Sequence, residues 1–302
     1  MDTDTGSDDA IALVLAVRDP LVEIRAVTVV AGNVPLDRAC HNALVTLDVC
    51  QAAHVPVHVG RGQPLVRPLE TAQFTHGHDG MGGADLAAPS REPTSMDAVG
   101  ELVRIARGEP GCHDLVTLGP LTNIAAAIDI EPDILSAFGH VYLMAGAPDG
   151  VGNVNAHGEY NVWADPESAT RVLAAPGDKT LIGWNVSRRH AVITPDEQTR
   201  LREVGPLGAF AVEINSDVHD YATATGLAGF DLPDPIAMAV ALEPTMIRDA
   251  SDETLVVGLD EPTRGGTFPD RRHGVDPGNV RVVWEVDEAA FKRRLFDACR
   301  PT

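Results

Sequence analysis

Segments with the composition of buried strands alternate with helical segments along most of this 302-residue chain. The strand-like segments are residues 22–30, 56–60, 115–118, 140–145, 180–184, 256–257 and 280–286. The helical segments are residues 36–52, 96–107, 121–128, 166–174 and 288–298, and a capping box at 194–197 marks the start of another helix. Such alternation predicts an α/β fold of one domain, residues 1–302, with a mostly parallel central sheet flanked by helices.

Polar residues follow several of the predicted strands. Asp2 and Asp4, Asn33, the turn after Leu118 and the loop 146–161 all follow predicted strands. Ligands bind at the carboxyl ends of the strands in sheets of this kind. We therefore expect these residues to gather at one edge of the sheet and to form the functional site.

The first nine residues carry four carboxylates, and an apolar helical run follows at once. Asp8 and Asp9 open that helix, where acidic side chains suit the positive end of the helix dipole. This simple interpretation leaves Asp2 and Asp4 unexplained. Because crowded carboxylates repel one another and hard divalent cations take oxygen ligands, the motif predicts a metal or catalytic site.

Charge and composition narrow the class of partner. The formal net charge is −21, which argues against binding to nucleic acid phosphates or to an anionic membrane surface and favours a small uncharged substrate or a cation. The four cysteines form no CxxC pair, and no stretch has the pattern of a signal peptide or a membrane span. We expect a soluble cytoplasmic protein with reduced thiols.

Two long irregular stretches, residues 61–94 and 146–165, lie between the predicted elements. The first holds the run Thr-His-Gly-His-Asp-Gly at 75–80, and the second holds Gly152-Asn153 and Glu159-Tyr160-Asn161. Long segments of this kind in a single domain are typically functional loops, so both are expected at the site.

Together these motifs resemble those of the nucleoside hydrolase family of the inosine–uridine-preferring type. The resemblance implies a Rossmann-like fold. The resemblance rests on Asp2, Asp4, Asp8 and Asp9, on Val-Ala-Gly-Asn at 30–33, on Leu-Gly-Pro-Leu-Thr-Asn-Ile-Ala at 118–125, on the 152–161 motif, and on Asp234-Pro235. It spans nearly the whole chain in the right order. The resemblance implies hydrolysis of the N-glycosidic bond of ribonucleosides, a bound Ca²⁺ ion, and a homodimer or homotetramer.

The resemblance also implies roles for particular residues. It matches the ligands of the Ca²⁺ ion to Asp4, Asp9, Asp234 and the backbone carbonyl of Leu118. Asp4 matches the general base, and His76 matches a histidine near the base pocket that we expect to take part in catalysis. The expected substrate-binding residues are Asp8, Asn33, Asn153, Glu159, Asn161 and Tyr221. A ring of carboxylates and amide oxygens suits the reaction, because breaking the bond gives the ribose oxocarbenium character.

Two departures from the family pattern bear on function. Some members have a histidine just before the last metal ligand, where it protonates the departing base, and this chain has Pro233 there. Activation of the leaving group must then come from another residue, or the substrate must need less of it. The family also has a strand before its first aspartate, whereas this sequence starts at Met1, so either the true start lies upstream or the first strand is shortened.

Two rival functions remain open at this point. Asp2-Thr3-Asp4-Thr5 also fits the opening of haloacid-dehalogenase-like phosphatases, with Lys179 as the candidate for the lysine that they need. A Ca²⁺-dependent nucleoside or ribose receptor with weak or no catalysis would carry the same ribose-binding residues. Taken singly, Asn33 could be a turn residue, Glu159 a surface charge, and Asp234 a helix N-cap.

Overall fold

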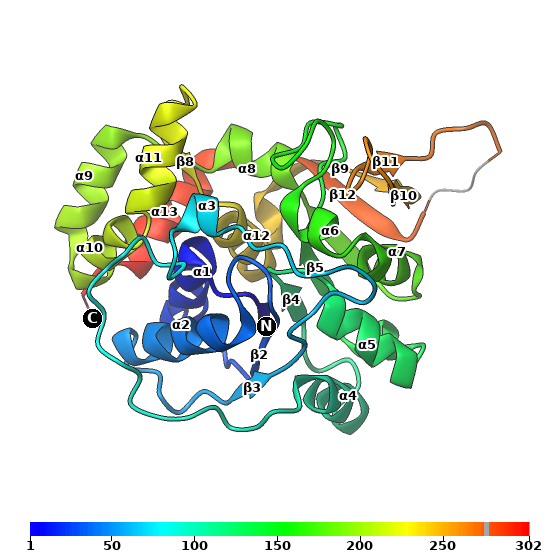
Figure 1. Cartoon of the computed structure of the whole chain (residues 1–302), viewed down its shortest axis with the longest axis horizontal. Coiled ribbons are helices and arrows are strands. Elements are labelled where there is room, and N and C mark those ends of the chain that lie inside the picture. Colours follow the sequence, from blue (N-terminus) through cyan, green and yellow to red (C-terminus); the bar gives the residue numbers. More distant parts are fainter. Residues whose placement is uncertain (275–277, 302) are drawn as a thin grey trace.

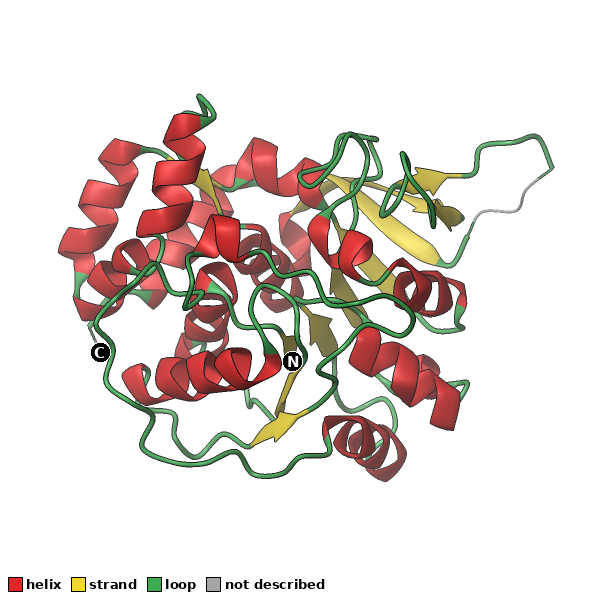
Figure 2. Ribbon diagram, viewed as in Figure 1, coloured by secondary structure: helices red, strands yellow, loops and turns green. Residues whose placement is uncertain are grey.

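Strand β1 (Asp2–Thr3) is the third strand of an eight-stranded sheet whose order is β3-β2-β1-β4-β5-β6-β12-β9. Figures 1 and 2 show the sheet among the surrounding helices. This computed structural model describes residues 1–274 and 278–301. The other strands of the sheet are β2 (Val27–Val29), β3 (Val57–Val59), β4 (Leu115–Thr117), β5 (Val141–Met144), β6 (Lys179–Ile182), β9 (Ile247–Glu253) and β12 (Val280–Val286). Two small antiparallel pairs are formed by β7 (Val192–Ile193) with β8 (Phe230–Asp231) and by β10 (Leu255–Val257) with β11 (Thr267–Pro269).

The sheet is parallel apart from its edge strand β9, which runs antiparallel to β12. The chain starts at β1 and moves outward through β2 and β3, then returns to the other side of β1 and continues through β4, β5 and β6. The strand order therefore reverses between β1 and β4. In doubly wound sheets a ligand crevice forms at this point, outside the carboxyl ends of the strands.

Helices cover both faces of the sheet (Figure 1). The first six are α1 (Ser7–Arg18), α2 (Leu36–Val49), α3 (Gln73–His76), α4 (Ala98–Gly108), α5 (Thr122–Ile130) and α6 (Tyr160–Ala164). The rest are α7 (Pro166–Ala174), α8 (Trp184–His190), α9 (Pro195–Val204), α10 (Pro206–Glu213), α11 (Ser216–Ala224), α12 (Pro233–Leu242) and α13 (Glu288–Ala298), with 3₁₀ turns η1 (Ile134–Ala137) and η2 (Pro244–Met246). Helices α2, α1, α12 and α13 pack on one face, and α4, α5 and α7 pack on the other.

Burial explains why the central elements are apolar throughout. All residues of β2, β3, β4, β5 and β6 are buried, as expected for parallel strands with helices on both faces. Helix α1 is buried from Ser7 to Ala16 because it packs on the sheet between α2 and α12. A helix surrounded in this way needs apolar residues on every side, which the run from Ala10 to Val17 supplies.

The predicted α/β fold with its mostly parallel, helix-flanked sheet is confirmed. The predicted segments 166–174, 280–286 and 288–298 coincide with α7, β12 and α13. Strand β1 has two residues and pairs with both β2 and β4. The strand predicted at 180–184 is too long, since β6 ends at Ile182 and Trp184 begins α8. Within the described residues, no helix is both long and apolar enough to span a membrane.

Candidate active site

Four buried aspartates meet where β1 and α1 join at the carboxyl edge of the sheet. Asp4 follows β1 directly, and Asp8 and Asp9 lie in the first turn of α1. Asp234 comes from the first turn of α12, which packs against α1. Each of the four side chains is at most 7% exposed. Asp4 thus lies at the edge of the sheet where it is predicted, whereas Asp2, predicted at the same edge, is part of β1 itself.

Carboxylate oxygens of Asp8, Asp9 and Asp234 lie within 4.8 Å of one another, a spacing that allows them to share one metal ion. Asp4 is close enough to Asp9 and Asp8 for their charges to raise its pKa. The charge of Asp4 likewise contributes to the raised pKa of Asp234. The cluster thus has a core of three carboxylates with Asp4 beside it.

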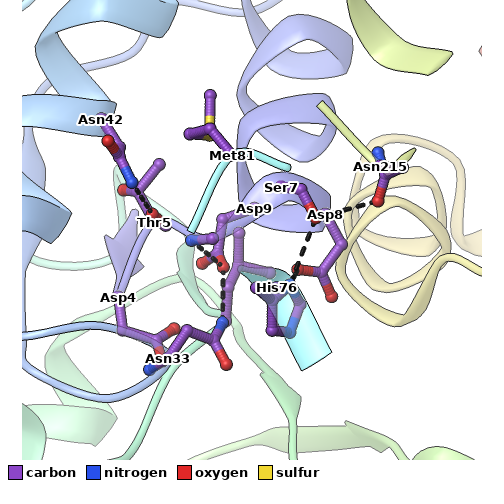
Figure 3. A network of polar contacts seen from close by, with 12 residues as sticks. Asp4, Thr5, Ser7, Asp8, Asp9, Asn33, Asn42, His76, Met81 and Asn215 are labelled. Carbon is purple, nitrogen blue, oxygen red and sulfur yellow. Dashed lines mark hydrogen bonds and ion pairs between the residues drawn. The ribbon is translucent and has the colours of Figure 1, made fainter. Parts of the chain in front are cut away.

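Hydrogen bonds fix the orientation of two of these carboxylates (Figure 3). Asp9 accepts from Thr3 Oγ1 at 2.6 Å and from the backbone N–H of Gly6 at 2.9 Å. Asn33 contacts both aspartates, because its backbone N–H donates to Asp4 Oδ2 at 2.5 Å and its Nδ2 donates to Asp9 Oδ2 at 3.2 Å. Asn33 therefore links the two carboxylates by hydrogen bonds. A residue that only formed a turn would not make these contacts.

Burial raises the pKa of every carboxyl in this cluster, and repulsion by neighbouring carboxylates raises it further for Asp4, Asp9 and Asp234. Burial is the main cause for all four; for Asp8 it raises the pKa to about 6. Among the described residues, no lysine or arginine forms an ion pair with any of them, and Asp4 Oδ1 and Asp8 Oδ1 accept no hydrogen bond. Buried carboxylate oxygens without donors, set this close together, fit a hard divalent cation as the compensating charge.

The carbonyl of Leu118 lies at the end of β4, beside the cluster. Asn161 Nδ2 donates to this carbonyl at 2.7 Å and to the carbonyl of Met144, at the end of β5, at 3.1 Å. A carbonyl oxygen has two lone pairs, so the bond from Asn161 leaves Leu118 one further acceptor site. Asn161 thereby links the ends of two neighbouring strands at the site.

A cavity of about 290 Å³ opens above the aspartates. Nine of the predicted site residues line it, namely Asp8, Asn33, His76, Leu118, Asn153, Glu159, Asn161, Tyr221 and Asp234. Asp4 and Asp9 are fully buried and do not line this cavity. The structure thus brings together residues from both irregular stretches, 61–94 and 146–165, around the same opening.

Glu159 is a buried N-cap, 2% exposed, and not a surface charge. Its carboxylate accepts from the backbone N–H groups of Gly146 at 2.6 Å and Asn161 at 2.9 Å. Burial raises its pKa to about 7 despite these bonds. Asn153 lies beside it and accepts from the backbone N–H of Tyr160 at 2.9 Å. The loop before α6 is therefore held in a defined conformation by the residues that line the cavity.

His76 ends α3 and is held by a chain of hydrogen bonds (Figure 3). Asn215 Nδ2 donates to the carbonyl of Ala211 at 2.9 Å, which turns Asn215 Oδ1 toward Ser7, whose Oγ donates to it at 2.9 Å. Since that bond uses the only proton of Ser7, its contact with His76 Nδ1 at 3.2 Å must be donated by Nδ1–H. Asp8 Oδ1, 3.7 Å from Nδ1, favours the same tautomer.

The neutral form of His76 is therefore protonated on Nδ1, and its Nε2 is a hydrogen-bond acceptor. Burial lowers the pKa of His76 to about 4. At neutral pH the ring is thus uncharged.

Aromatic rings from α3 and α11 meet at the opening of the cavity. Phe74 and Tyr221 pack edge to face with ring centroids 6.3 Å apart. Phe74 is 64% exposed and Tyr221 is 40% exposed. Exposed aromatic rings that line a cavity of this kind offer flat apolar surface to a planar ligand.

Several residues that line the cavity are not predicted from the sequence: Phe74, Trp184, Asn215 and Asp231. Ser7 is also part of the site through its bonds to His76 and Asn215. Ser7 sits within the acidic opening motif, and that position was the one available signal. Asn215 is the N-cap of α11 and Asp231 lies on β8, and no sequence pattern predicts these two elements.

The residues of the rival phosphatase interpretation are not assembled into a site. Asp2 is buried and accepts from Thr28 Oγ1 at 2.6 Å and Asn123 Nδ2 at 2.8 Å, so it holds the sheet together. Lys179 lies at the start of β6, away from the carboxyl edge, and donates to the carbonyls of Ala175 and Gly177. Asp234 also differs from its simple interpretation, since Leu232 is the N-cap of α12.

Comparisons with known proteins agree with this geometry. Residues 1–293 match the family model described as inosine-uridine preferring nucleoside hydrolase. The chain is 33% identical to the pyrimidine-specific ribonucleoside hydrolase RihB of Escherichia coli, over 96% of this chain and 93% of the relative. It is 31% identical to probable uridine nucleosidase 2 of Arabidopsis thaliana, over 98% and 95%.

Solved structures give the same result. The purine-preferring ribonucleoside hydrolase from Gardnerella vaginalis superimposes with a TM-score of 0.92 at 29% identity, covering 99% of this chain and 96% of that one. Two of these proteins are named for uridine or pyrimidine substrates and one for purines. Similarity of this kind identifies a shared fold and reaction type and leaves the preferred base unassigned.

Proposed function

This chain belongs to the inosine–uridine-preferring nucleoside hydrolase family and is a nucleoside hydrolase, and from that premise we propose that it cleaves the N-glycosidic bond of ribonucleosides in a Ca²⁺-dependent reaction. The products are ribose and the free base, and the transition state has oxocarbenium character. The observation that carries the proposal is the cluster of four buried aspartates beneath the 290 Å³ cavity, at the point where the strand order reverses.

Calcium fits this cluster because all the available ligand atoms are oxygens. We propose that Asp4, Asp9, Asp234 and the carbonyl of Leu118 hold the ion, with Asp8 facing the cavity beside them. When bound, a divalent ion lowers the pKa of a coordinated water and so supplies a nucleophile at neutral pH. The oxygens of Asp9 and Asp234, which lie within 4.8 Å of each other, support this assignment.

Asp4 is proposed as the general base that takes a proton from the attacking water. Its Oδ2 is bound by the backbone N–H of Asn33, which leaves Oδ1 available for the proton. Burial and the charge of Asp9 raise the pKa of Asp4 well above that of a solvated aspartate. A stronger base close to its proton donor is more effective near neutral pH.

The remaining polar residues are proposed to bind the ribose. Asp8 and Asn161 contact its 2′- and 3′-hydroxyls, Asn153 and Glu159 hold the 5′-hydroxyl, and Asn33 lies beside the reacting carbon. All five line the cavity, and four of them are less than 9% exposed. Carboxylate and amide oxygens around the sugar stabilise the positive charge that develops on it.

The base is proposed to lie on the side of α3 and α11. His76 and Tyr221 line this side together with Phe74. The ring of a purine or pyrimidine would stack on the exposed aromatic surface, and His76 would contact its edge.

Release of free base from a panel of purine and pyrimidine ribonucleosides, followed by chromatography, tests the function. We expect release that stops when a strong Ca²⁺ chelator is added and resumes when Ca²⁺ is restored. A folded protein that binds Ca²⁺ but releases base from no nucleoside would instead be a nucleoside or ribose receptor. The pattern of activity across the panel gives the base preference.

We also propose that the enzyme is a cytoplasmic homodimer or homotetramer. The four free cysteines, among them buried Cys40 and Cys299, fit a reducing compartment. Light scattering coupled to size-exclusion chromatography measures the oligomeric state, and cell fractionation tests the compartment.

A further inference from the structure

The proposed reaction needs a source for the proton that neutralises the departing base, and Pro233 cannot supply one. Asp231 lies two residues before Pro233, on β8, and its side chain lines the same cavity. Strand β8 contacts α11, the helix that carries Tyr221. Asp231 therefore comes from the wall of the cavity that we assign to the base.

The position of Asp231 is fixed from one side. Ser187 Oγ, on α8, donates to Asp231 Oδ2 at 2.5 Å, and β8 is paired with β7 through Val192 opposite Asp231. Asp231 is half-buried and lies in the lining of the cavity. One carboxyl oxygen is thus held by the protein while the group keeps contact with the cavity.

Most other ionisable groups that line the cavity make contacts that leave them without a proton to donate to the base. Asp8 and Asp234 belong to the acidic cluster. The oxygens of Glu159 accept bonds from backbone N–H groups, which makes them poor donors to a ligand. Tyr160 donates its hydroxyl proton to the carbonyl of Glu70 at 3.0 Å.

Two lining groups remain to be compared with Asp231. The hydrogen-bond chain through Ser7 and Asn215 places the proton of neutral His76 on Nδ1, so Nε2 accepts a hydrogen bond and has no proton to give. Tyr221 carries a phenol, and phenols are much weaker acids than carboxylic acids.

We propose that Asp231 is the general acid that protonates the departing base, with Ser187 as its positioning residue. The inference rests on the proposed nucleoside hydrolase function. As the C1′–N bond breaks, its electron pair goes to the base nitrogen, and the proton of the Asp231 carboxyl goes to the base. Water forms the new C1′–O bond and loses a proton to Asp4, and exchange with solvent returns both carboxyls to their starting forms.

The surroundings of Asp231 raise the fraction of its carboxyl that is protonated above that of a solvated aspartate. Burial, helped by the charge of Asp8, raises its pKa to about 6, while the bond from Ser187 acts in the opposite direction. A carboxyl of this kind holds its proton at higher pH than a solvated aspartate and still releases it readily to a developing anion.

Asp231→Asn tests the proposal, because the amide can still accept from Ser187 but has no acidic proton. Turnover should be compared on inosine and uridine, whose bases leave poorly, and on 4-nitrophenyl riboside, whose phenolate leaves without a proton. We expect kcat on the nucleosides to fall roughly 100-fold or more, the usual size of general acid catalysis, while kcat on the nitrophenyl substrate changes by about twofold at most. Asp231→Glu should recover part of the loss.

The controls distinguish a loss of catalysis at Asp231 from a general effect of the substitution on the protein. Asp129→Asn makes the same substitution at an exposed residue paired with Arg171, far from the cavity lining, and should behave as the wild type. Equal losses on both substrate classes in a folded Asp231→Asn protein, or no loss on either, would overturn the role of Asp231. So would a selective loss on nucleosides in His76→Ala with none in Asp231→Asn.

Failure of the proposed function gives a different result. If the wild type cleaves neither the nucleosides nor the nitrophenyl riboside, the hydrolase function fails and the role of Asp231 fails with it. If the wild type cleaves the nitrophenyl riboside but no nucleoside, the protein is a glycosidase and Asp231 does not protonate a departing base.

Discussion

The backbone N–H of Asn33 donates to Oδ2 of Asp4 across 2.5 Å, and this bond makes the two oxygens of Asp4 unequal. Oδ2 is held by the loop after β2, whereas Oδ1 is buried without a hydrogen-bond donor among the described residues. The side chain of the same Asn33 also reaches Asp9. One residue after a strand thus orients two of the carboxylates on which the proposed chemistry depends.

We expect Asp4→Asn to lower kcat by about 10²–10⁴-fold, since an amide cannot take the proton of the attacking water. The amide oxygen can still accept from Asn33, so the fold around β2 should persist. Its NH₂ group would also face the cation, so Ca²⁺ affinity should fall. Steady-state kinetics and calorimetric titration measure the two effects, and near-wild-type turnover in a folded variant would remove Asp4 from the role of base.

Gly32 tests whether the exact placement of Asp4 matters. A Cβ at Gly32 would lie 2.1 Å from Asp4 Oδ2 and 2.7 Å from Cδ of Pro120, so Gly32→Ala must displace the carboxylate. A shift of about 1 Å in a catalytic group costs on the order of 100-fold in rate, and we expect kcat to fall by a similar factor. Gly108→Ala is the matched control, because nothing lies within 4 Å of its Cβ position. Unchanged kinetics in both variants would show that the site tolerates movement of Asp4.

Asp9→Ala and Asp234→Ala should each weaken Ca²⁺ binding by at least tenfold, because each removes a charged ligand from a buried cluster. Isothermal titration calorimetry on protein freed of divalent ions gives the affinities directly. Asp129→Ala removes an exposed carboxylate outside the cluster and serves as the control. If both cluster variants bind Ca²⁺ as the wild type does, the proposed ligand set is wrong.

Local signals explain the parts of the fold that the sequence predicts well. Helix α7 begins at a proline with Asp165 as its N-cap, and α13 begins after the N-cap Asp287. Strand β12 is continuously β-rich, and it fills a sheet position next to β6. In each case the residues that define the boundary are adjacent in sequence, so no tertiary contact is needed to infer it.

The elements that the sequence does not reveal have weak local patterns. Strand β9 carries Arg248, Asp249, Asp252 and Glu253, and none of its residues is fully buried, because it is an edge strand with one neighbour. Helix α11 buries only Ala222 among its nine residues. Neither segment has the hydrophobic periodicity on which prediction depends.

The site likewise has parts that the sequence predicts and parts that it does not. The acidic motif and the segment after Leu118 are short runs of residues whose composition indicates a site, and the structure brings them together. The hydrogen bond between Ser7 and Asn215 joins residues 208 positions apart, and Asp231 enters the cavity only through the packing of β8. Contacts of this kind depend on the complete fold.

Asn153→Ala should raise KM for nucleosides by about tenfold, because we assign its side chain to the 5′-hydroxyl. Loss of a hydrogen bond worth about 1 kcal/mol weakens binding by a factor of about five. The loss is larger when the partner, here the 5′-hydroxyl, stays buried without another hydrogen bond. The same substitution should leave KM for 5′-deoxynucleosides unchanged, since these lack the partner. Equal increases for both substrate classes would show that Asn153 acts through the loop before α6 instead.

The buried acidic groups predict an unusual dependence of stability on pH in protein freed of divalent ions. The folded pKa is raised to about 6 for Asp2, Asp8 and Asp231, and to about 7 for Glu159. The folded state therefore binds more protons than the unfolded state between pH 4.5 and 6, and stability should fall as pH rises through this window. His76, whose folded pKa is about 4, has the opposite sign, as do His41, His58 and His140, whose pKa values burial also lowers. The raised pKa values of Asp4, Asp9 and Asp234 add to the first group, which therefore outnumbers the histidines.

Bound Ca²⁺ should reverse this trend, because it stabilises the ionised carboxylates. At a Ca²⁺ concentration 100 times Kd, the gain is about 2.7 kcal/mol, which corresponds to roughly 5 °C or more in Tm for a domain of this size. Thermal unfolding at pH 5 and pH 6.5, with and without Ca²⁺, measures both effects. A metal-free protein that becomes more stable over that interval, or a Tm that does not respond to Ca²⁺ at pH 6.5, would contradict the assignment of the cluster as a cation site.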